Sequence, residues 1–244
     1  MKKVRLHQFS APVGASSAAQ RVRAVLFDAG GTLIHVDGER ICRAAGIAFD
    51  PAAFRGAETT AVGAVRALVL EKPESRDAER IPLYFDTMLS CLGVADAERR
   101  RDGIRAVAAE HQRANLWSQR AEGSAETLEE LRRRGYRTAV VSNADGRVRG
   151  LLDDAGLSPH LEFVVDSAEV GIEKPDARIF HAATSRLGLA PEACAYVGDI
   201  YEIDVVGAAG AGLWPVLIGD GPAAGPVVRV PDLRALLPLF PAFA

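Results

Sequence analysis

The sequence predicts an α/β fold: a doubly wound, mostly parallel sheet with an inserted all-α segment. From residue 124 onward, short apolar runs alternate with helical patterns, which is typical of parallel strands joined by right-handed crossovers. A further apolar run at 22–27 ends in a glycine-rich turn. Between these regions, residues 37–117 show helical periodicity and almost no strand signal.

These patterns divide the chain into three parts. Residues 1–20 are polar and aperiodic, so we expect a loose tail. Residues 21–36 and 118–244 are expected to form the sheet-containing core, and 37–117 a small helical domain inserted after the first strand. In that domain, apolar residues recur at helical spacing in three groups: Phe54, Ala61, Val62, Val65, Leu68 and Val69; Ile81, Tyr84, Phe85, Met88, Leu89 and Leu92; Ile104, Val107, Ala108 and His111.

The second half of the chain supplies the remaining elements of the predicted core. Strands are expected at 136–141, 161–165, 194–197 and 213–218. Helices are expected from Ser124 as N-cap to Gly135, up to Gly156, from Asp176 to Gly188, and from about Tyr201. The apolar end at 233–239 is expected to pack back on the core.

Composition narrows the range of functions. The chain has 244 residues and a formal net charge of −3, which gives no electrostatic case for a nucleic-acid or membrane partner. No apolar stretch approaches the ~20 residues of a membrane-spanning helix, and Lys2 and Lys3 are not followed by the apolar core that a signal peptide would have. The three scattered cysteines, Cys42, Cys91 and Cys194, are expected to be small buried hydrophobes in a reducing cytoplasm. The sequence leaves the oligomeric state open.

Chemistry-bearing residues follow the predicted strands in four short islands. They are Asp28 with Gly30, Gly31 and Thr32; Ser142 with Asn143; Lys174 with Pro175; and Gly198 and Asp199 with Asp204. Loops after parallel strands meet at one edge of a doubly wound sheet, so we expect these islands to converge. Carboxylates with one hydroxyl and one ammonium group suit nucleophilic catalysis on a phosphoryl group with a divalent cation.

In this order, DxxGT, SN, KP and GDxxxxD resemble the haloacid dehalogenase superfamily of mostly Mg²⁺-dependent phosphatases. The resemblance covers residues 22–218, with 37–117 matching a helical cap. It implies that Asp28 is the nucleophile that forms an aspartyl-phosphate, and that Ser142 and Lys174 contact the phosphoryl group. It also implies Mg²⁺ on Asp28, Asp199 and the backbone carbonyl of Gly30, with support from Asp204. Gly31 and Asn143 are further candidates for substrate contact, although Asn143 also fits an ordinary turn residue.

Position 30 departs from the family pattern. The phosphatases of this family usually carry an Asp there, which protonates the leaving oxygen and then activates water. Gly30 keeps the backbone carbonyl and lacks the carboxylate. We therefore expect metal binding to survive, whereas general acid–base help, typically ~10²–10⁴-fold in rate, is lost unless another group provides it. Substrates with good leaving groups would suffer least.

The sequence thus predicts a Mg²⁺-dependent hydrolase of a small phosphorylated metabolite, with alternatives. One is a catalytically weak relative that binds Mg²⁺ and a phosphorylated ligand or partner. Another is a carbon–halogen or a carbon–phosphorus hydrolase. In the carbon–phosphorus case Lys72, the only lysine of the helical insertion, would form an imine with an aldehyde substrate. Trp117 and Trp214 are expected to be packing residues, Trp117 at the junction of the insertion and the core.

Overall fold

The computed structural model describes residues 21–243, so the expected tail at 1–20 lies outside the described residues. Within them, a six-stranded sheet has the order β5-β4-β1-β6-β7-β8, and every neighbouring pair is parallel. The predicted doubly wound α/β fold is therefore confirmed. The strands are β1 (Ala24–Phe27), β4 (Arg137–Ser142), β5 (Val164–Asp166), β6 (Cys194–Gly198), β7 (Trp214–Ile218) and β8 (Val228–Val230).

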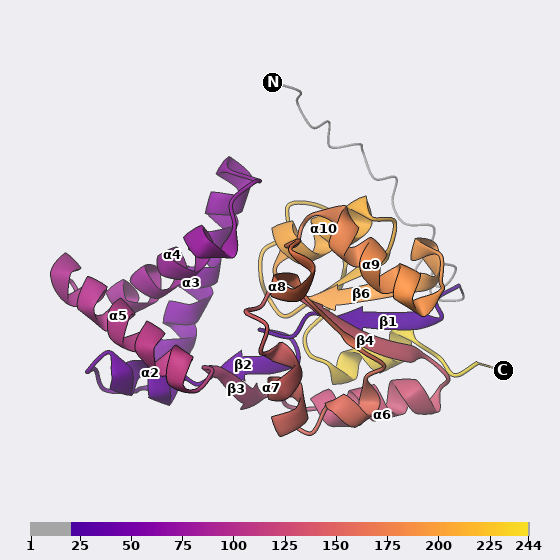
Figure 1. Cartoon of the computed structure of the whole chain (residues 1–244), viewed down its shortest axis with the longest axis horizontal. Coiled ribbons are helices and arrows are strands. Elements are labelled where there is room, and N and C mark those ends of the chain that lie inside the picture. Colours follow the sequence, from indigo (N-terminus) through magenta and orange to yellow (C-terminus); the bar gives the residue numbers. More distant parts are fainter. Residues whose placement is uncertain (1–20, 244) are drawn as a thin grey trace.

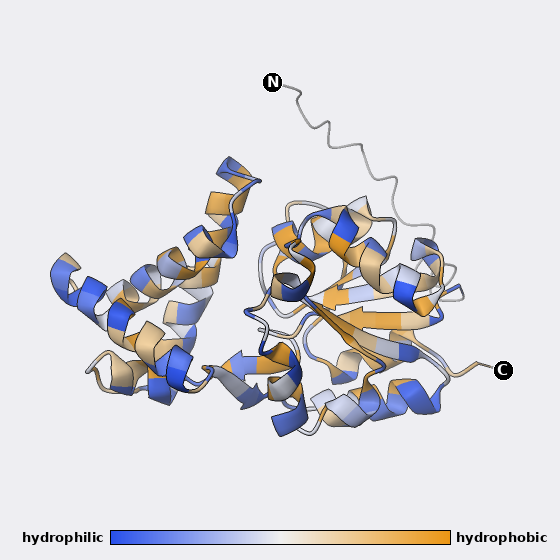
Figure 2. Ribbon diagram, in the orientation of Figure 1, coloured by the Kyte–Doolittle hydropathy of each residue, from blue (hydrophilic) through white to orange (hydrophobic). Residues whose placement is uncertain are grey.

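Helices cover both faces of this sheet (Figure 1). Alternate strand residues face opposite sides, so Phe27 and Val197 join one apolar cluster while Leu26 and Tyr196 join another. The first cluster contains side chains of α6 (Ser124–Arg133), α7 (Val148–Asp154) and η4 (Arg234–Leu239). The second contains side chains of α9 (Ala177–Leu187) and α10 (Val206–Gly210). Figure 2 shows the strands as the most hydrophobic part of this region.

Four helices lie to one side of the sheet in Figure 1 and have an apolar cluster of their own. We call them the helical unit: α2 (Gly38–Ala44), α3 (Pro51–Glu71), α4 (Asp77–Cys91) and α5 (Ala97–Arg113). Local sequence explains where they begin. Asp50 accepts a hydrogen bond from Ala53 N at 2.7 Å at the start of α3, and Asp96 accepts one from Arg99 N at 2.8 Å at the start of α5.

A two-stranded antiparallel pair joins the helical unit to the sheet: β2 (Ile34–Val36) carries the chain out and β3 (Trp117–Arg120) brings it back. The sequence pattern does not predict this pair. Its strands have only three and four residues, and most of β3 is exposed, so the alternation in β2 is too short to be a signal and β3 shows none. Trp117 is the first residue of β3 rather than part of a helix or loop.

Several local expectations are corrected by the structure. Gly123, not Ser124, occupies the N-cap of α6, because the Ser124 hydroxyl donates back to Ala121 O at 2.8 Å. The helix expected from Tyr201 begins as one π-helical stretch, η3 (Tyr201–Val205), and β8 was not anticipated. Cys42 and Cys194 are buried as expected, whereas Cys91 is exposed.

The remaining elements are short. They are α8 (Ser167–Val170), η1 (Ser158–His160) and η2 (Pro191–Ala193). As expected, α9 is capped by Asp176 and ends at Gly188, and the apolar C-terminal segment packs on the sheet through Leu233, Leu236 and Phe240. Across 21–243, none of the helices combines the length and the apolar character that a bilayer crossing requires.

Candidate active site

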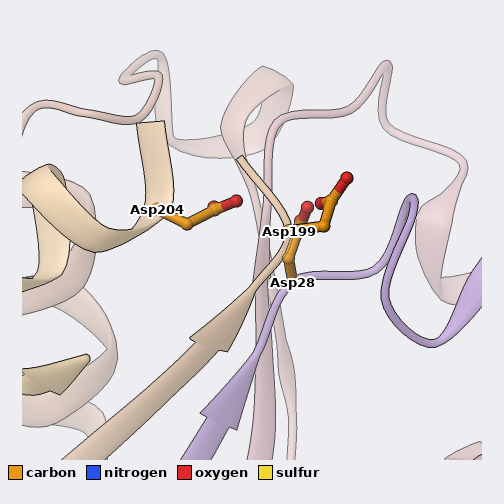
Figure 3. A group of neighbouring side chains, drawn as sticks. All are labelled: Asp28, Asp199 and Asp204. Atoms are coloured by element: carbon orange, nitrogen blue, oxygen red, sulfur yellow. The ribbon is translucent and has the colours of Figure 1, made fainter. Parts of the chain in front are cut away.

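Three adjacent strands bring the predicted residues to one edge of the sheet. Asp28 follows β1, Asp199 follows β6, and Ser142 is the last residue of β4. Because β4, β1 and β6 are neighbours and parallel, their carboxyl ends lie side by side. Figure 3 shows Asp28 and Asp199 at the ends of adjacent strands, with Asp204 directed toward them from the following helical turn.

Lys174 connects these acids. Its ammonium group lies 2.8 Å from Asp28 Oδ1 and 2.7 Å from Asp204 Oδ1, and it donates to the Tyr196 hydroxyl at 2.9 Å. The side chain is only 2% exposed, so these contacts replace its hydration. Tyr196 in turn donates to Val141 O at 2.7 Å, and this bond fixes the position of the hydroxyl that accepts from Lys174. The residue predicted from the KP island therefore lies at the centre of the site.

Two glycines allow this crowding. Gly31 has a φ of +77°, and a side chain there would overlap the carboxylate of Asp199. A side chain at Gly198 would overlap the carboxylate of Asp204. Because positions 31 and 198 are glycines, Asp199 and Asp204 can approach the backbone more closely than a residue with a side chain would permit.

Burial and mutual repulsion dominate the electrostatics. Burial raises the pKa of Asp28 to about 6, with Lys174 opposing and Asp204 adding to the increase. Burial, followed by the charges of Asp204 and Asp28, raises the pKa of Asp199 well above its usual value. Although burial disfavours the charged form of Lys174, the two acids beside it hold its pKa well above the ordinary value. Three acids thus face one ammonium group.

This excess of negative charge suits a divalent cation. Ligand oxygens of Asp28, Asp199 and Asp204 all lie within 4.8 Å of one another. Asp199 Oδ1 is buried and has no hydrogen-bond partner within residues 21–243, so an acceptor is left over. The Asp204 oxygens are instead taken by Lys174 Nζ and by Ile200 N at 2.9 Å. Asp28 and Asp199 therefore offer the more available hard oxygen ligands, and Asp204 lies behind them.

The acids open onto a cavity of about 150 Å³ between the sheet and the helical unit. One side is the sheet-edge cluster, defined as Asp28, Ser142, Lys174, Asp199 and Asp204. The other side is the helical wall, defined as Glu58, Asp77, Arg80, Tyr84 and Trp117. Burial raises the pKa of both wall carboxyls, and Glu173 adds to the increase at Asp77.

The helical wall is joined to the sheet-edge cluster by hydrogen bonds. Arg80 Nη1 donates to Lys174 O at 3.2 Å, and Asn143 Nδ2 donates to the same carbonyl at 3.2 Å. Asn143 Oδ1 accepts from Lys174 N at 2.7 Å, and its amide also reaches Asp77 Oδ1 at 3.4 Å. Asn143, a candidate for substrate contact, thus clamps the backbone of Lys174 in this structure. Glu173 Oε2 further accepts from Asp77 N at 3.0 Å.

Sequence reasoning assigned none of the helical wall to the site. The apolar periodicity indicates a packing role for Tyr84, and no motif marks Glu58, Asp77 or Arg80. Asp77, Arg80 and Tyr84 do share a face of α4 by their spacing, but spacing alone does not tell which surface that face meets. Tyr196 was likewise hidden in an apolar strand.

One candidate residue, Lys72, lies away from the cavity. Lys72 is at the end of α3, half-exposed and 2.5 Å from Glu79 Oε2, and it does not line the cavity. This position gives no support to an imine-forming lysine. Ser142, Gly30 and Gly31 do line the cavity.

Comparison with known proteins gives independent evidence about the family of this chain. The model of the haloacid dehalogenase-like hydrolase family matches residues 22–212. Human "haloacid dehalogenase-like hydrolase domain-containing protein 3" is 40% identical over 125 residues, which are 48% of this chain and 50% of the relative. Phosphoserine phosphatase of Thermus thermophilus is 44% identical over 113 residues, 44% of this chain and 45% of that protein. The chain spans about half the length of these curated relatives.

A similar fold occurs among solved structures. A dehalogenase solved with an intermediate complex superposes with a TM-score of 0.66 and 24% identity, covering 92% of this chain and 99% of that one. This likeness concerns the fold alone.

Proposed function

Because this chain belongs to the haloacid dehalogenase-like hydrolases, we propose that it is a Mg²⁺-dependent phosphatase of a small phosphorylated metabolite. One observation carries the proposal: Asp28, Lys174 and two further acids meet at the floor of a single cavity. Phosphatases among its relatives, such as phosphoserine phosphatase, support the phosphoryl chemistry. The cytoplasmic location expected from the cysteines stays a prediction.

In the proposed reaction, a carboxylate oxygen of Asp28 attacks phosphorus and the bond from phosphorus to the leaving oxygen breaks. Water then attacks the same phosphorus, the bond to Asp28 breaks, and inorganic phosphate leaves with the free carboxylate restored. Lys174 lies 2.8 Å from Asp28 Oδ1, where its charge would stabilise negative charge on the transferring group. Ser142, buried at the end of β4, has a hydroxyl that could donate to a phosphoryl oxygen.

Asp28, Asp199 and the carbonyl of Gly30 are the groups that we assign to Mg²⁺. When bound, the ion would offset the repulsion among the acids and draw charge from the phosphoryl oxygens. Asp204 would act from behind, since it holds Lys174 and the backbone at Ile200.

We assign the role of cap to the helical unit. Its wall residues line the cavity opposite Asp28, so side chains such as Glu58 and Tyr84 would contact the part of the substrate that differs between metabolites. Exclusion of water by such a cover also strengthens electrostatic interactions inside the site.

The alternative of a catalytically weak binder is favoured by one observation, the absence of a carboxylate at Gly30. It predicts that Mg²⁺ and phosphate raise the melting temperature while turnover stays near background.

The decisive assay uses the full chain with an activated aryl phosphate and Mg²⁺. We expect turnover that a chelator abolishes, and a loss of ~10³-fold or more in Asp28→Asn, which is nearly isosteric. Intact-mass analysis of quenched enzyme should detect one added phosphoryl group in the parent and none in the variant.

Asp166→Asn is the matched control. Asp166 also ends a strand of the same sheet, but it lies outside the cavity and accepts from Ala168 N and Gly146 N, each at 2.9 Å. This variant should lose stability and keep parental turnover. Equal turnover in parent and Asp28→Asn would refute the assigned nucleophile.

A further inference from the structure

The space above Gly30 is occupied by a side chain from another element. A Cβ added to Gly30 would lie 3.0 Å from both Cδ1 and Nε1 of Trp117, the first residue of β3. Both residues line the cavity with Asp28. A side chain at position 30 would thus begin in tight contact with the indole ring.

Two aromatic side chains pack against this indole ring. Phe85 of α4 contacts it edge-on with ring centroids 6.3 Å apart, and His111 of α5 does so at 5.7 Å. His111 is itself tied to Asp145 Oδ2 at 3.0 Å, and the backbone N–H of Trp117 donates to Asn115 Oδ1 at 2.9 Å. The ring is therefore part of the packed junction between β3 and the helical unit.

The indole ring of Trp117 differs chemically from a carboxylate at position 30. Within residues 21–243 the indole N–H makes no hydrogen bond, although it lies beside the cavity. An indole N–H donates a hydrogen bond but does not give up its proton near neutral pH, and it offers no acceptor. It can stabilise a developing anion, whereas it cannot protonate a leaving oxygen or activate water.

We propose that Trp117 takes the place of a side chain at position 30 and thereby restricts the enzyme to phosphates whose leaving group departs as a stable anion. The substrates would be acyl phosphates and aryl or enol phosphates rather than simple alkyl phosphates. Trp117 is a specificity-determining residue in this view, and the inference rests on the proposed phosphatase function.

The test measures kcat/KM with Mg²⁺ for a series of aryl phosphates whose phenols differ in pKa. The parent should slow steeply as the phenol becomes a poorer leaving group, by ~10²-fold or more across the series. Gly30→Asp alone should not flatten this dependence, because the new side chain meets the indole ring. Gly30→Asp combined with Trp117→Val should flatten it and gain most on the poorest leaving group.

Trp214→Phe is the matched control, because Trp214 lies in β7 outside the cavity and packs on Phe240. This variant should keep the parental slope. In the same background Trp117 is the only tryptophan of the chain, and its fluorescence should change when inorganic phosphate binds with Mg²⁺.

The outcomes separate the two proposals. A flat parental slope, or a slope flattened by Gly30→Asp alone, would overturn the role of Trp117 while leaving the phosphatase assignment intact. A double variant that is folded by circular dichroism and still shows the parental slope would do the same. Absence of turnover on every member of the series, in a folded parent, would overturn the phosphatase assignment itself.

Discussion

The sheet-edge cluster and the helical wall face the same cavity, but their side chains are held in different ways. On the sheet side, Lys174 and Asp204 are almost fully buried and paired with each other, and Asp28, Ser142 and Asp199 follow or end strands of the sheet. On the wall side, Glu58 has one side-chain hydrogen bond, from Tyr84 Oη at 3.3 Å, and the side chain of Asp77 is about a third exposed.

This difference separates chemistry from selectivity. Residues at strand ends are fixed by the register of the sheet, so they can hold reacting groups within the narrow limits that catalysis needs. Residues on a helix surface can change without disturbing that register. Glu58 and Asp77 are therefore the wall residues that can adapt to different substrates at little cost in stability, whereas Arg80 is buried and donates to Lys174 O.

The largest effect is expected at the centre of the sheet-edge cluster. Lys174→Met removes the cation between Asp28 and Asp204 and leaves two buried acids unpaired, which should lower the free energy of unfolding by ~3–5 kcal/mol. Denaturant unfolding would measure the loss. Lys72→Met, at an exposed ion pair with Glu79, is the control and should unfold like the parent. If both variants have equal stability, the cluster is not the electrostatic centre described above.

A second test concerns the contact between the two sides. Arg66 of α3 and Glu202 of η3 form a buried bidentate ion pair at 2.5 and 2.7 Å, which joins the helical unit to the segment that carries Asp204. Arg66→Leu or Glu202→Leu alone should lower the free energy of unfolding by ~3–5 kcal/mol, because each substitution leaves one buried charge unpaired.

The double variant with leucine at both positions should recover most of that loss. Equilibrium unfolding of all four proteins gives the coupling free energy. Additive losses would mean that the pair does not couple the two sides. We also expect KM to rise more than kcat falls in the single variants, because the cavity wall shifts while Asp28 stays in place.

The smallest effect is expected on the helical wall itself. Glu58→Gln and Tyr84→Phe should change KM by about tenfold or less, the scale of one hydrogen bond, and leave kcat on an aryl phosphate within a few-fold. Thr60→Ala, on the exposed side of the same helix α3, should change neither parameter. Steady-state kinetics would reveal the split. A large fall in kcat for Glu58→Gln would instead place this carboxyl among the groups that take part in the chemical step.

Sequence reasoning predicted the sheet side far better than the wall. Apolar runs followed by Asp28, Ser142 or Asp199 are local signals, and the geometry of parallel strands turns their order into proximity. The β2–β3 pair was missed because its strands are short and mostly polar on β3. The cap of α6 was misassigned to Ser124, because the sequence does not reveal that its hydroxyl finds Ala121 O first.

The wall escaped prediction for a different reason. Helical periodicity tells which residues share a face, but not what that face meets. Trp117 was expected to pack at the junction, and it does, yet its closeness to Gly30 joins positions 87 residues apart in the chain. The pairing of Arg66 with Glu202, 136 residues apart, is equally invisible to local patterns.

The β2–β3 pair has a consequence for how such a chain can diversify. Ile34 lies opposite Arg120, so the chain leaves for the helices and returns at neighbouring points. Inserted segments whose two ends lie close together are tolerated well, since exchanging them does not distort the domain that carries them. A different helical segment could be grafted between these two strands while the hydrolytic machinery is inherited unchanged, and new specificities would then arise by module exchange as well as by point mutation.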